Sequence, residues 1–161
     1  MASEAVDRDV VITRVLSAPR ALVFEAWTRP EHVMHWWQPM GLGSAVCEAL
    51  DARPGGAFRV RVRGPEGIEQ LWYGVFREVV PPERIVFEDA CDEKGAVFHR
   101  TVTTVTFEDV GGKTHVTMHA TLDFVPGRDA KYTPDFMRRG WAAGWERILT
   151  LLERHLGVAQ E

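Results

Sequence analysis

The sequence predicts an α+β fold in which a curved antiparallel sheet of six to seven strands wraps around one long C-terminal helix. Three observations indicate this fold: segments of alternating apolar and polar residues run through the middle of the chain, Gly- and Pro-rich turns separate them, and a long amphipathic helical pattern comes last. Strands joined by short turns are expected to be antiparallel neighbours. We expect a single domain over residues 1–161, with its core at about residues 10–156.

A strand and two short helices are expected first. Alternation around Val11 and Thr13 predicts a strand at residues 9–16. Pro19 suits the first position of a helix, because that position needs no backbone N–H. Residues 28–31 end this helix and start a second short one.

Six further strands are expected, joined by turns. Their predicted ranges are residues 44–50, 58–63, 68–80, 84–91, 97–108 and 114–124. Gly55 and Gly56 form one turn, where we expect positive φ values that cost other residues energy. Arg59, Arg61 and Arg63 alternate with apolar residues, which predicts a half-buried strand with a basic outer face, either solvated or able to bind an acidic partner.

The last expected element is a long helix. Thr133 is a suitable N-cap, Pro134 fits the first helical position, and Asp135 complements the helix dipole. A continuous apolar stripe follows at spacings of three and four, formed by Met137, Trp141, Trp145, Ile148, Leu152 and Leu156. Gly140 and Gly144 lie beside this stripe, where each costs the helix about 1 kcal/mol relative to Ala. Either the helix approaches the sheet closely at these glycines, or it leaves room there for something else.

Composition and charge argue against several classes of protein. The net charge of −4 argues against nucleic-acid binding and, more weakly, against a membrane-surface protein. No apolar run approaches the roughly 18 residues that span a bilayer, and Met1 to Asp9 do not resemble a signal peptide, so we expect a cytoplasmic location. Cys47 and Cys91 form no CxxC pair and are expected to be buried, reduced thiols.

Short motifs along the chain carry a family resemblance. They are Ala18-Pro19-Arg20, Phe24-Glu25-Ala26-Trp27-Thr28, Pro30-Glu31, Trp36-Trp37, Arg53-Pro54-Gly55-Gly56, the run from Gly74 to Arg84, and Gly140-Trp141. In this order they resemble the START-like (SRPBCC) superfamily, which has the helix-grip fold. Within it, the chain is similar to the branch named for the activator of the ATPase of the ninety-kilodalton heat-shock protein. The resemblance extends from about Val10 to Leu156.

The resemblance implies a cavity between the concave face of the sheet and the last helix. It implies no single activity, because members of the superfamily bind lipids, hormones and polyketides, and some catalyse cyclisation or aromatic-ring chemistry. Strand parity predicts the side chains that face the cavity. If Val105 and Phe107 point inward, then His99, Thr101 and Thr103 do so too, forming a polar edge on an apolar face.

The expected ligand-binding residues combine aromatic rings with this polar edge, as in most ligand pockets. They are Trp36, Trp37, Trp72, Phe76, His99, Thr101, Thr103, Met118, Met137, Trp141 and Trp145. Phe98 belongs to the same aromatic set, whereas parity turns His119 outward. The alternative is a fully packed core without a cavity.

Histidines are the candidates for chemistry. His99 could act as an acid or base, with Glu69 as a partner at the rim, or could be a hydrogen-bonded structural residue. Burial should lower its pKa. His32 and His35 are spaced to share a metal ion, but further ligands are not evident, and we expect no metal or cofactor.

The function we expect is binding of a small hydrophobic or aromatic molecule. One alternative is an enzyme of the cyclase or hydrolase kind that uses His99 with a carboxylate or a Thr hydroxyl. Another is a regulatory domain that contacts a chaperone. Nucleic acid and membrane are not expected partners, and a homodimer is an open alternative.

Overall fold

The structure is a computed structural model that describes residues 8–40, 43–93, 96–124 and 134–160, without the side chains of residues 96–98, 124, 134 and 159. The N-terminal elements are β1 (Asp9–Leu16), α1 (Arg20–Thr28) and α2 (Pro30–Trp36). Six strands follow: β2 (Ser44–Leu50), β3 (Ala57–Arg63), β4 (Glu69–Val80), β5 (Arg84–Glu93), β6 (Ala96–Val110) and β7 (Lys113–Phe124). The last element is α3 (Pro134–Ala159).

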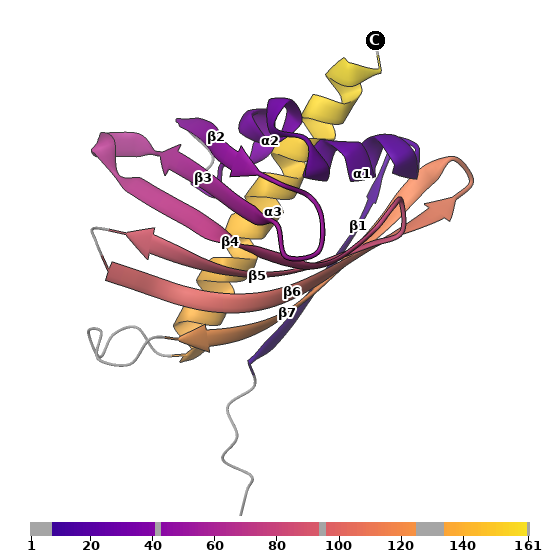
Figure 1. Ribbon diagram of the computed structural model, residues 1–161. Helices are drawn as coiled ribbons and strands as arrows, with labels where there is room; N and C mark the ends of the chain where they lie inside the picture. Colours follow the sequence, from indigo (N-terminus) through magenta and orange to yellow (C-terminus); the bar gives the residue numbers. More distant parts are fainter. Residues whose placement is uncertain (1–7, 41–42, 94–95, 125–133, 161) are drawn as a thin grey trace, which may run out of the picture.

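The described strands form one seven-stranded antiparallel sheet in the order β1-β7-β6-β5-β4-β3-β2. Figure 1 shows this sheet curving around α3, with α1 and α2 beside the C-terminal half of that helix. The predicted α+β helix-grip architecture is therefore confirmed. The predicted cap at Thr133 lies outside the described residues, as does the side chain of Phe98.

Curvature of the sheet has local causes. Register shifts interrupt the pairing of β4 with β5 and of β5 with β6, and such bulges bend a strand. At Gly74 the neighbouring backbone approaches so closely that a Cβ atom would lie 1.9 Å from the carbonyl oxygen of Glu88. Only glycine fits there without a backbone shift, so this position helps β4 to follow β5 around the helix.

The turn at Gly55 and Gly56 needs glycine for two different reasons. Gly55 has a φ of +85°, as predicted. Gly56 does not have a positive φ, but a Cβ atom there would lie 1.9 Å from the carbonyl oxygen of Asp51. The turn is fastened to β4 by two backbone hydrogen bonds, from Gly55 N to Phe76 O at 2.8 Å and from Phe76 N to Gly56 O at 2.9 Å.

The core lies between the concave face of the sheet and the helices. The apolar stripe of α3 is buried along its length, and Trp145, Ile148, Leu152 and Leu156 are each at most 2% exposed. Tryptophans from the N-terminal helices pack on this stripe: the ring of Trp27 stacks on Trp145 with centroids 5.5 Å apart. Among the described residues, no helix is both long and apolar enough to cross a membrane.

Candidate ligand-binding cavity

A cavity of about 200 Å³ lies between the N-terminal half of α3 and the strands β4, β5 and β6. The sheet contributes Gln70, Trp72, Cys91 and His99, and the segment after α2 contributes Pro39 and Met40. The helix contributes Phe136, Met137, Gly140, Trp141, Gly144 and Arg147. The cavity is open to solvent on the side of Phe136, which is 49% exposed.

The floor of the cavity is one row of residues across three strands. Trp72 pairs with Cys91, and Cys91 pairs with His99, so strand alternation turns all three side chains to the concave face. The rings of Trp72 and His99 meet edge to face, with centroids 5.3 Å apart. Burial lowers the pKa of His99 to about 4 and raises the pKa of the Cys91 thiol, so both groups are neutral at pH 7.

A short chain of hydrogen bonds leads from this floor to the rim. The indole Nε1 of Trp72 donates to Oε1 of Gln70 at 3.0 Å, and Nε2 of Gln70 donates to Oε1 of Glu93 at 2.9 Å. Gln70 therefore separates the Glu93 carboxylate from the cavity.

The two glycines of α3 form part of the cavity wall. A Cβ atom at Gly140 would meet nothing within 4 Å, and one at Gly144 would lie 3.5 Å from Cβ of Pro39, an ordinary contact. Neither glycine is required by close approach of the helix to the sheet. Of the two explanations open at the sequence level, these glycines fit the one in which the helix leaves room.

Four of the predicted ligand-binding residues line this cavity, namely Trp72, His99, Met137 and Trp141. The other seven are buried in the packed interior: Trp36, Trp37, Phe76, Thr101, Thr103, Met118 and Trp145. Trp37 and Phe76 border only a void of about 20 Å³, room for little more than one water molecule. Trp37 packs against Trp145, which itself stacks on Trp27, and Phe76 packs against Phe58 and Phe87, so both rings belong to the packed core.

Asp89 is a buried acid that the sequence analysis missed. It faces Thr101, whose hydroxyl donates a hydrogen bond to its carboxylate. Burial raises the pKa of Asp89 to about 7. Ile85 and Phe87 were expected on one face of their strand, and the same alternation places Asp89 on that face. The sequence could therefore have shown that Asp89 lies on the concave face.

The remaining lining residues carry weaker sequence signals. Cys91 follows the same parity as Asp89, and Arg147 lies three positions after Gly144 on one helical face. Pro39 and Met40 lie after α2, where no periodic pattern identifies the side chains that turn inward.

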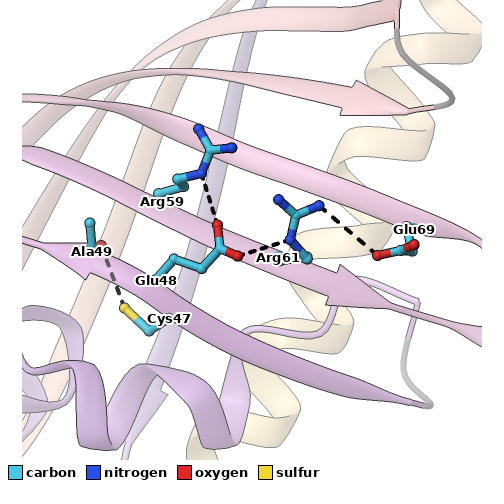
Figure 2. Close-up of polar contacts among 6 residues, drawn as sticks. All are labelled: Cys47, Glu48, Ala49, Arg59, Arg61 and Glu69. Atoms are coloured by element: carbon cyan, nitrogen blue, oxygen red, sulfur yellow. Dashed lines mark hydrogen bonds and ion pairs between the residues drawn. The ribbon is translucent and has the colours of Figure 1, made fainter.

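The possible acid–base pair of His99 with Glu69 is not formed. Glu69 lies on the outer face of the sheet, where its carboxylate pairs with Arg63 at 3.5 Å and Arg61 at 4.0 Å. Figure 2 shows the neighbouring pairs, in which Glu48 accepts hydrogen bonds from Arg59 and Arg61. In this exposed network, carboxylates of the same sheet pair with most of the basic outer face of β3.

Cys47 lies beside this network and is half-buried, not buried as predicted, because it belongs to the edge strand β2. Its thiol lies 3.6 Å from the carbonyl oxygen of Ala49. Cys91 is buried as expected, and both thiols are free.

A third histidine joins the pair on α2. Nδ1 of His32 lies 2.8 Å from Nε2 of His155, and the ring of His35 stacks on His155 with an angle of 12° between the planes. Stacked rings do not direct their nitrogens to a common point. Among the described residues, no group of three or more such side chains is arranged to hold a metal ion.

An antiparallel sheet closed over a long C-terminal helix, with a cavity between them, defines the START-like helix-grip class of proteins. Residues 17–157 match the family model described as "Activator of Hsp90 ATPase homolog 1-like protein", and the chain belongs to this family. A search of curated proteins found no match.

Solved structures agree with this assignment. An uncharacterised protein from Rhizobium leguminosarum is 31% identical with a TM-score of 0.74, and the match covers 91% of this chain and 94% of that one. A Nitrosomonas europaea protein is 25% identical with a TM-score of 0.75, covering 97% of this chain and 98% of the other. A Staphylococcus epidermidis protein, also 25% identical, has a TM-score of 0.74 and covers 100% of this chain and 96% of its own.

Proposed function

We propose that this protein binds a small apolar or aromatic molecule in the cavity between the sheet and α3. Family membership supports a ligand-binding domain in general terms. The character of the ligand and the use of this cavity rest on the residues that line it.

The observation that carries the proposal is the pair of glycines on α3. Each lowers helix stability by about 1 kcal/mol relative to Ala, yet the surrounding atoms would accept a Cβ at both positions. Packing therefore does not explain them. The cavity explains these glycines, because Gly140 and Gly144 both border it and side chains at these positions would narrow it.

The walls have the chemistry of a pocket for an apolar ring. Trp72, Met137 and Trp141 supply large apolar surfaces, and His99 and Cys91 add polar groups that are neutral at pH 7. Pockets for small molecules are mostly apolar, with a few polar groups that orient the ligand. The cavity of about 200 Å³ is smaller than the range of roughly 300–1,000 Å³ for drug-sized ligands, which favours one or two rings.

The test compares two glycines of the same helix. Gly140→Leu should fill the cavity and abolish binding of the neutral probe 2-naphthalenemethanol, measured by isothermal titration calorimetry. Gly157→Leu is the matched control, because a Cβ at Gly157 also meets nothing within 4 Å but Gly157 lies outside the cavity. Equal binding by both variants would contradict the proposal, and so would no binding by the unchanged protein.

A further inference from the structure

We propose that the preferred ligand is a small aromatic anion, such as an aryl carboxylate, whose negative group is held by Arg147 in the cavity wall beside Pro39. This inference rests on the proposed function and adds the charge of the ligand to it.

The Arg147 guanidinium is fixed in place and available to a ligand. Its Nε donates a hydrogen bond of 2.7 Å to the carbonyl oxygen of Pro39, which orients the group beside the cavity. Among the described residues, no carboxylate lies within ion-pair distance of Arg147. Two arginines nearer the start of the helix behave differently, because Arg138 and Arg139 both pair with Asp135. The Nη donors of Arg147 can therefore meet an acceptor from outside the protein.

The other lining groups leave this positive charge uncompensated. Of the lining residues that the structure describes, Arg147 alone carries a formal charge at pH 7, since His99 and Cys91 are neutral. Glu93 accepts a hydrogen bond from Gln70 and lies outside the lining. In addition to burial, Asp89, Glu93 and Asp92 act on Cys91 at the floor and raise the pKa of its thiol. The attraction for an anion is therefore strongest beside the Arg147 guanidinium.

A second donor also favours a ligand that accepts hydrogen bonds. The Trp141 ring borders the cavity, and its Nε1 is buried with no acceptor among the described residues. An unpaired buried donor is costly, so a ligand oxygen that reached it after a small ring movement would be stabilised. The planar guanidinium suits a carboxylate in particular, because the two groups can form parallel hydrogen bonds.

The experiment uses two probes of the same ring system, 2-naphthoate and neutral 2-naphthalenemethanol, titrated by calorimetry at pH 7. We expect naphthoate to bind about tenfold more tightly, with an affinity that falls as salt rises. Arg147→Gln should remove this preference, so that naphthoate and the neutral probe bind the variant with equal affinity. Arg147→Lys, which keeps the charge, should retain part of it.

Arg139→Gln is the matched control, since it removes the same charge from an exposed position of the same helix. If the neutral probe binds as tightly as naphthoate, or if Arg147→Gln and Arg139→Gln have equal effects, the anion inference fails and the proposed function stands. If neither probe binds the unchanged protein, both fail. Thermal unfolding of each variant establishes that the fold is intact.

Discussion

The two ends of the concave interior share one sheet face but differ in what stands opposite it. Beside α1 and α2, tryptophans from three helices meet phenylalanines of the sheet and leave a void of only about 20 Å³. Beside the N-terminal half of α3, the opposing wall contains Gly140 and Gly144, and the space is about 200 Å³. One face of a sheet therefore becomes a packed core or the floor of a cavity according to the side chains that the helices bring to it.

The largest expected effect is at the packed end. Trp145→Ala should lower the free energy of unfolding by about 3–5 kcal/mol, because Trp145 is 1% exposed and packs on Trp27 and Trp37. Phe136→Ala, at the open mouth of the cavity, should cost much less. Urea denaturation of both variants checks the contrast, and similar losses would mean that the two ends are equally packed.

The region between the two ends can be tested at Asp89, through the change in folding stability as the pH rises. Its folded pKa of about 7 exceeds the ordinary value of 3.8, so the folded state holds a proton that the unfolded state has lost. The stability that this group contributes is therefore complete below about pH 4 and falls as the pH rises towards 7. Asp89→Asn removes this loss and should raise stability at pH 8 by as much as about 4 kcal/mol. Unchanged pH dependence of urea denaturation would show that Asp89 ionises freely in the folded protein.

His99 gives the opposite dependence on pH at the cavity floor. Its folded pKa of about 4 is below the ordinary value of 6.5, so the unfolded state binds more protons between these values. Stability is complete above pH 6.5 and falls by about 3 kcal/mol as the pH drops towards 4. His99→Phe keeps a ring beside Trp72 and should abolish this loss. NMR titration of His99 measures the pKa directly, and a value near 6.5 would contradict the burial.

The smallest effects concern two glycines, for which the same substitution should have opposite signs. Gly55→Ala should lower stability by about 1 kcal/mol, because Gly55 has a φ of +85°. Gly140→Ala should raise stability by up to about 1 kcal/mol, because the helix gains propensity and the new Cβ meets nothing. Melting temperatures of the two variants suffice as a readout. A loss at Gly140 would show that this glycine has a packing role.

The order of elements and the face of each strand residue could be predicted from the sequence, because both follow from local periodicity. Parity correctly turned Thr101, Thr103 and Met118 inward and His119 outward. The boundary between core and cavity could not be predicted. Whether Trp37 belongs to the packed core or lines the cavity depends on Trp145, which is distant in sequence but packs against the Trp37 ring in the structure.

Other parts of the cavity depend on tertiary structure in the same way. Pro39 and Met40 belong to a non-periodic segment, and the exposure of Arg147 to the cavity follows from its contact with Pro39, 108 positions away in sequence. The two α3 glycines were visible as exceptions to helix propensity, and they remained the most informative signal in the sequence.

These glycines have a consequence for laboratory evolution of the protein. In most proteins, random substitutions that improve thermal stability are neutral to function or spread over many sites. Here, replacement of Gly140 by nearly any other helix-forming residue would both raise the melting temperature and reduce the volume open to a ligand. A library screened for heat resistance alone would therefore accumulate variants with a closed cavity. Under the proposed function, a library screened for ligand retention would keep the less stable helix.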